Sequence, residues 1–167
     1  MLFRSKAENE AEALDSWNAA KKTQKGYESR TEMLTSVSKA LPALMRAAKV
    51  QSRSAKFGFT YGSVEKTLAD LKGEISELEA AIASKNSLEI EDELGDVLFA
   101  AANLSSLLKC EAEEALCKST EKFIRRVAKC EEYSKADGMA DLADVLPDKL
   151  DKYWKRAKKQ LLLGTQS

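Results

Sequence analysis

Apolar residues recur at helical spacing over most of the chain beyond residue 40. Leucines and isoleucines three or four positions apart form one stripe in each periodic segment, as on the buried face of a helix. The periodic segments are 63–83, 88–109, 111–133 and 141–163, the last divided near Pro147. A further helix is expected from about residue 41, because Pro42 suits an early helical position. No segment alternates as a strand does, so the pattern predicts an all-α, antiparallel helical bundle.

Short polar or glycine-containing segments separate these helices. Residues 57–62 (FGFTYG) form a loop with apolar content, and Ser63 is the expected N-cap of the helix that follows. Residues 84–87 form the turn between the next two helices. The polar N-terminal part predicts a helix from about residue 8 to residue 25. The expected organisation is an N-terminal helical arm, residues 1–40, and a helical domain, residues 41–167.

Composition and charge narrow the function. Lysine plus arginine and aspartate plus glutamate are both 27, so no net charge favours nucleic acid or a membrane surface as a partner. The chain has no histidine, which removes the commonest zinc ligand and the commonest general base. Its three cysteines lack CxxC spacing and are expected to be reduced thiols. A soluble, cytoplasmic protein is expected.

Two pairs of carboxylates stand out on consecutive helices. Glu74 and Glu77 are three residues apart, as are Glu93 and Asp96, so each pair projects from one helix face. Glu93 falls within or at the edge of its helix's apolar sector, where an unpaired carboxylate is costly. Four carboxylates on antiparallel neighbours would form an oxygen-only site, which suits Mg²⁺ or Mn²⁺. The alternative is a solvated acidic face, the usual role of glutamates at this spacing.

Several segments together resemble the MazG family of nucleotide pyrophosphohydrolases. The segments GEISELEAAI, EDELGDVLFAAANL and STEKFIRRV contain that family's ExxE and ExxD motifs, here Glu74 with Glu77 and Glu93 with Asp96. The similarity extends from about residue 14 to residue 160. It implies an all-α fold completed by dimerisation, as a homodimer or a dimer of dimers. It also implies Mg²⁺-dependent hydrolysis of nucleoside triphosphates to the monophosphate and pyrophosphate, with the four carboxylates as metal ligands and catalytic residues.

The resemblance also implies substrate contacts away from the carboxylates. Lys122 and Arg126 match basic family positions and would bind the phosphates; their alternative role is a solvated basic face. Phe59 and Tyr61 would stack on the base or ribose, or else simply anchor their loop. With no histidine, the general base would be a glutamate or a metal-activated water.

This chain departs from the family pattern at Tyr61, where a tryptophan is often found, and at two further positions. Gly73 stands where many members have a further glutamate, and Thr120 replaces a frequent asparagine. The departures at Gly73 and Thr120 favour an alternative, in which the chain is a nucleotide-binding or regulatory module with the same fold and weakened or lost activity. A purely structural bundle is the other alternative. The sequence does not decide which base and sugar are preferred or how many metal ions are bound. It also does not decide whether the substrate is a modified or an ordinary nucleotide.

Overall fold

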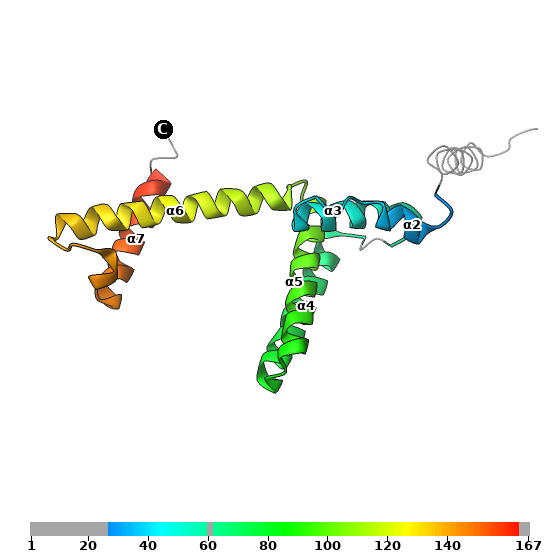
Figure 1. Cartoon of the computed structure of the whole chain (residues 1–167), viewed down its shortest axis with the longest axis horizontal. Coiled ribbons are helices and arrows are strands. Elements are labelled where there is room, and N and C mark those ends of the chain that lie inside the picture. Colours follow the sequence, from blue (N-terminus) through cyan, green and yellow to red (C-terminus); the bar gives the residue numbers. More distant parts are fainter. Residues whose placement is uncertain (1–26, 60–61, 164–167) are drawn as a thin grey trace, which may run out of the picture. The chain divides into compact units, whose positions relative to one another are not determined.

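The computed structural model describes residues 27–59 and 62–163, which are helical and contain no strand (Figure 1). The elements are α2 (Arg30–Thr35), α3 (Ala43–Ser54), the 3₁₀ turn η1 (Ala55–Phe57), α4 (Val64–Ser84), α5 (Ser87–Leu107), α6 (Ala112–Ala136), the 3₁₀ turn η2 (Leu142–Asp144) and α7 (Pro147–Leu163). The all-α prediction is confirmed, and α4 to α7 follow the four periodic segments closely. The helix expected over residues 8–25 lies outside the described residues.

Local side-chain caps fix the ends of the central helices. The Ser63 Oγ accepts a hydrogen bond from the Lys66 backbone N–H at 3.2 Å, so the predicted N-cap of α4 is confirmed. Asn86 caps α5 by accepting from the Leu88 N–H at 3.2 Å. Between them, Lys85 takes a left-handed conformation at φ 58°, which reverses the chain in a very short turn. The tight turn makes α4 and α5 antiparallel neighbours.

The chain divides into two compact units, residues 1–109 and 110–167. In the first unit, α4 and α5 lie side by side (Figure 1), and α3 packs against α5. The Gln51 Nε2 donates to the Phe99 carbonyl at 2.8 Å and ties these two helices together. Arg53 holds α2 against α3 by donating to the Met33 carbonyl and to the Ser36 Oγ. The predicted division into residues 1–40 and 41–167 stays a prediction.

The second unit has its own small core between α6 and α7. Its buried members are Cys130, Tyr133, Val145, Tyr153 and Ala157. At the edge of this core, the Tyr153 hydroxyl donates to the Asp137 carboxylate at 2.6 Å, and the Lys149 Nζ lies 2.8 Å from the same oxygen. Lys149 and Tyr153 therefore hold the pKa of Asp137 below its usual value. The contacts fix η2 and the start of α7 against the end of α6.

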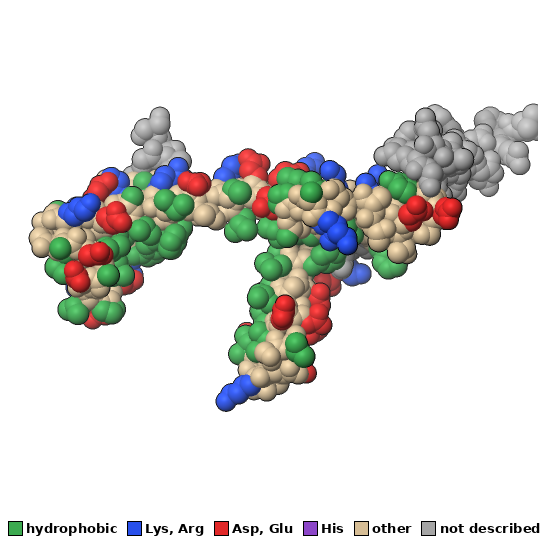
Figure 2. Space-filling model, viewed as in Figure 1, with side chains coloured by type: hydrophobic (Ala, Val, Ile, Leu, Met, Phe, Trp, Pro, Cys, Tyr) green, Lys and Arg blue, Asp and Glu red, His purple; other side chains and the backbone are tan. Residues whose placement is uncertain are grey.

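Many large apolar side chains of the first unit remain exposed. Figure 2 shows hydrophobic side chains along the α4–α5 pair, and the exposed ones include Leu68, Ile75, Ile82, Leu94 and Leu98. The stripe predicted to be buried on α4 is thus only partly covered within the described residues. Despite its apolar content, no helix of the described segments has the length and hydrophobicity needed to cross a membrane.

Candidate metal centre and nucleotide pocket

Three of the four predicted carboxylates converge on one point between α4 and α5. Glu74, Glu77 and Glu93 each offer a carboxylate oxygen, and these oxygens lie within 4.8 Å of one another. Glu74 and Glu77 are one helical turn apart on α4, and the antiparallel α5 places Glu93 opposite them. Glu74 and Glu93 are half-buried, whereas Glu77 is exposed. We call these three residues the glutamate triad.

The triad carries uncompensated negative charge. The Glu93 Oε2 is buried and has no hydrogen-bond partner among the described residues. Desolvation, followed by the charges of Glu77 and Asp96, raises the pKa of Glu93 above its ordinary value. The same causes, in the same order, raise the pKa of Glu74. In the described part of the chain, no lysine or arginine forms an ion pair with these carboxylates. The three carboxylates therefore repel one another, and no basic side chain of the described residues pairs with them.

The donor set fits a small, hard divalent cation. Its oxygens are all carboxylate oxygens, which suit Mg²⁺ and Mn²⁺, and the triad contains no sulfur or nitrogen donor. A cation placed between the three groups would neutralise their repulsion and give the buried Glu93 oxygen a partner. Mg²⁺ usually keeps several waters and needs only a few protein carboxylates. Three convergent oxygens are therefore sufficient for such a site.

Asp96, the fourth predicted ligand, lies beside the triad but outside the 4.8 Å group. It is exposed and lines a shallow acidic surface on α5 together with Glu89 and Asp92. Its charge nonetheless contributes to the raised pKa values of Glu74 and Glu93. Asp96 thus belongs to the electrostatic surroundings of the triad, and its role as a ligand stays a prediction.

A cavity of about 880 Å³ opens next to the triad within the first unit. Glu74 and Glu77 line one part of it, and Val50, Gln51 and Phe99 line another. Its volume lies within the range of about 300–1,000 Å³ typical of small-molecule sites. The lining is mixed: apolar side chains such as Leu34 and Phe99 stand beside polar and charged ones, which include Lys66 and Asp70. The cavity is consequently a candidate nucleotide pocket.

Gln51 is a residue of this pocket that the sequence analysis did not single out. It is only 6% exposed, its Nε2 is engaged by the Phe99 carbonyl, and its Oε1 has no partner among the described residues. Its position seven residues after Leu44 puts it on the apolar face of α3. A polar residue on that face was the available signal.

The loop aromatics occupy distinct places. Phe59 lines the nucleotide pocket and is 73% exposed. Phe57 is half-buried, meets the Phe59 ring edge-on at 5.7 Å and lies under the Arg30 guanidinium at 5.3 Å. Its contacts are those of a loop anchor. Tyr61, the other predicted base-stacking residue, lies outside the described residues.

Gly73 also lines the nucleotide pocket, one position before Glu74. A Cβ atom at position 73 would meet no neighbouring atom within 4 Å. The missing glutamate therefore leaves open space on the α4 surface, and the backbone there does not require glycine.

Lys122 and Arg126 lie on α6, in the second unit. They are four residues apart and share a helix face, as expected. Lys122 is exposed, whereas Arg126 is half-buried, with its guanidinium 5.6 Å from the centre of the Trp154 ring. The Thr120 hydroxyl is spent on the Leu116 carbonyl at 3.1 Å. The role of Lys122 and Arg126 in phosphate binding stays a prediction.

Comparison with known proteins decides the family of the segment that contains the triad. Residues 62–131 match the model of the MazG nucleotide pyrophosphohydrolase domain. This segment is similar to the MazG domain. The matched residues include the whole triad, Asp96, Lys122 and Arg126, so the resemblance inferred from the sequence motifs is confirmed.

Named relatives extend the similarity beyond the MazG domain. The nucleoside triphosphate pyrophosphohydrolase of Escherichia coli K12 is 35% identical over 158 residues, which cover 93% of this chain and 60% of that protein. The nucleoside triphosphate pyrophosphohydrolase/pyrophosphatase MazG of Thermotoga maritima is 34% identical over 142 residues, 85% of this chain and 54% of that protein. The uncharacterized protein YabN of Bacillus subtilis is 36% identical over 154 residues, 92% of this chain and 31% of that protein. The chain thus spans at most 60% of the length of these three relatives.

Proposed function

We propose that this MazG chain hydrolyses nucleoside triphosphates to the nucleoside monophosphate and pyrophosphate, as a cytoplasmic enzyme of the nucleotide pool. The main structural support is the glutamate triad, whose oxygens lie within 4.8 Å of one another beside a cavity of about 880 Å³. Two relatives are named as nucleoside triphosphate pyrophosphohydrolases, which supports the same reaction. Mg²⁺ is the proposed cofactor, held by Glu74, Glu77 and Glu93 with Asp96 close by, and Mn²⁺ is a possible substitute.

The reaction divides between the cation and the side chains. When bound, Mg²⁺ supplies neutralisation of phosphate charge and a lower pKa for a nearby water. A water molecule attacks the α phosphorus, the bond to the bridging oxygen breaks, and pyrophosphate leaves with that oxygen. A triad carboxylate oxygen takes the proton of the attacking water, a role for which a raised pKa such as that of Glu93 is suited. Lys122 and Arg126 are proposed to balance the charge of the phosphates.

Product analysis tests this proposal directly. With Mg²⁺ present, we expect equal amounts of monophosphate and pyrophosphate from at least one ordinary or modified nucleoside triphosphate, and no product after chelation with EDTA. Ion-exchange chromatography of the nucleotides together with an enzymatic pyrophosphate assay measures both products. Release of inorganic phosphate and a diphosphate would contradict the proposed bond cleavage. Nucleotide binding without turnover across the panel would instead favour the inactive binding module that Gly73 and Thr120 suggest.

We also propose that the chain is a homodimer or a dimer of dimers, with the apolar surface of the α4–α5 pair in the interface. Leu94 and Leu98 lie one turn apart on α5 and are 47% and 51% exposed. Exposed apolar residues in such a contiguous arrangement indicate an interaction surface. A bundle completed by a second copy would bury them.

Replacing Leu98 by Asp is expected to shift the protein to monomers, because a charge in the proposed interface would have to be desolvated. Sedimentation velocity at micromolar concentrations measures the change. Ser106→Asp, which adds the same charge at an exposed polar position of α5, is the matched control and should keep the wild-type state. A wild-type protein that sediments as a monomer would contradict the proposal.

A further inference from the structure

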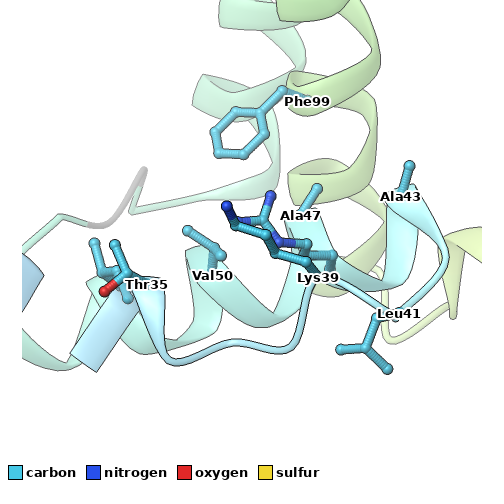
Figure 3. Close-up of a pocket in the computed structure, with 9 residues that line it drawn as sticks. Thr35, Lys39, Leu41, Ala43, Ala47, Val50 and Phe99 are labelled. Carbon is cyan, nitrogen blue, oxygen red and sulfur yellow. The ribbon is translucent and has the colours of Figure 1, made fainter. Parts of the chain in front are cut away.

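A second cavity, of about 470 Å³, lies beside the nucleotide pocket in the first unit (Figure 3). It is formed by the α2–α3 segment and closed by Phe99, whose ring stands over the cavity from α5 in the close-up. Leu34, Val50 and Phe99 line both cavities. The two cavities therefore adjoin at these three side chains, so the second cavity is the neighbouring space for the part of a ligand that lies away from the glutamate triad.

The charged groups of the second cavity are hydrogen-bond donors, whereas its one hydroxyl group, that of Thr35, is left as an acceptor. Its lining includes Lys39 and Arg46 and no carboxylate. Lysine and arginine side chains have donors only. The third polar residue of the lining, Thr35, already spends its hydroxyl hydrogen on the Glu32 carbonyl at 3.1 Å. The cavity thus offers two positive donor groups between apolar walls.

Arg46 has a hydrogen-bond donor without an acceptor among the described residues. It is half-buried, and its Nε is buried without a hydrogen-bond partner. Within the described segments, neither Arg46 nor Lys39 forms an ion pair. A partly buried guanidinium loses hydrogen bonds to water. A ligand with an acceptor atom in the cavity would replace those hydrogen bonds. The neighbouring Phe99 ring favours an acceptor on a flat, aromatic ligand.

We propose that this second cavity holds the base of the substrate nucleotide and that Arg46, with Lys39, selects bases that carry a keto oxygen. The inference rests on the proposed function, in which the triad end of the neighbouring pocket takes the phosphates. Guanine, hypoxanthine, uracil and thymine present a carbonyl oxygen to the donors, and arginine pairs well with the O6 and N7 atoms of guanine. Adenine and cytosine place an amino group at the equivalent position, so donor would face donor.

Matched substrate pairs that exchange a keto oxygen for an amino group test the selection. For UTP against CTP and ITP against ATP, we expect kcat/KM to favour the keto member by about tenfold, the effect of one good arginine–base contact. Arg46→Gln should bring both ratios near one, because a carboxamide can both donate and accept. Lys49→Gln, an exposed lysine of α3 outside the lining, is the matched control and should retain the preference. Circular dichroism checks that each variant is folded.

A binding measurement without turnover separates this inference from the proposed function. Calorimetric titration with UMP and CMP in the absence of divalent ions should show tighter binding of UMP, lost in Arg46→Gln and weakened in Arg46→Lys, which keeps the charge but not the planar fork. If UMP is preferred through Arg46 but no triphosphate is hydrolysed, the proposed function fails and the base selection stands. Equal affinity for UMP and CMP, or a preference for CMP, overturns the inference. So does Arg46-dependent binding of inorganic phosphate without any base preference, which would make the cavity an anion site.

Discussion

Replacing Glu93 by Gln is expected to lower kcat for pyrophosphate release by about 1,000-fold or more, because it removes one of the three carboxylates that hold the cation. A bound metal contributes several kcal/mol of transition-state stabilisation, and about 1.4 kcal/mol corresponds to a tenfold change in rate. The substitution keeps the shape of the side chain but replaces a charged oxygen by an amide. Pyrophosphate release under saturating Mg²⁺ and substrate measures the loss.

The fold should survive this substitution. In the protein without metal, Glu93 repels Glu77 and Asp96, so removal of its charge relieves repulsion and the melting temperature should not fall. Glu91→Gln, which lies on the same helix, is exposed and outside the triad, is the matched control and should leave kcat near its original value. A Glu93→Gln enzyme within tenfold of the original kcat would remove Glu93 from the proposed catalytic machinery.

The helices and their order could be predicted because their signals are local. The leucine and isoleucine period of residues 63–83 and the serine cap at Ser63 need no tertiary contact to be recognised. The short helix α2 was missed for the same reason. Its six residues are too few to show a period, and the contacts of Arg53 that hold it come from another helix.

The candidate site could be predicted only as far as spacing on one helix decides it. The spacing of three positions from Glu74 to Glu77 puts both on one face of α4, whatever lies opposite. Whether Glu93 or Asp96 points at Glu74 and Glu77 depends on the rotation of α5 about its own axis. The periodicity of α5 puts Glu93 and Asp96 near different edges of the apolar sector but does not fix that rotation. Packing against α4 brings Glu93 into the triad and leaves Asp96 exposed beside it.

The apolar residues that line the pocket could not be predicted from the sequence. Val50 and Phe99 are ordinary apolar residues in ordinary helical stripes, and nothing in the sequence pairs α3 with α5. A buried glutamine amide bridges the two helices, and such a bridge is visible only once the helices are placed. Donor and acceptor chemistry of a lining is therefore information that the structure adds.

Magnesium should stabilise the protein strongly at pH 7 and much less near pH 4.5. The pKa values of Glu74 and Glu93 are raised above the ordinary 4.5, so the folded protein binds protons more tightly than the unfolded chain does. Without metal, the free energy of unfolding therefore falls as the pH rises above about 4.5, until both groups are ionised. A cation bound between the three carboxylates at pH 7 would offset their mutual repulsion. Free Mg²⁺ at 100 times its dissociation constant should then add about 2.7 kcal/mol.

Thermal and urea unfolding with MgCl₂, compared with NaCl of equal ionic strength, measure this gain at the two pH values. Near pH 4.5, protons compete for the same oxygens, so the gain should shrink because metal binding must release them. Glu93→Gln should lose most of the gain at pH 7, whereas Glu91→Gln should keep it. An equal gain at both pH values, or one that Glu93→Gln retains in full, would mean that Mg²⁺ binds elsewhere on the chain. The loss of the gain in Glu93→Gln, with its retention in Glu91→Gln, thus locates the cation at the triad independently of any nucleotide and of any catalytic turnover.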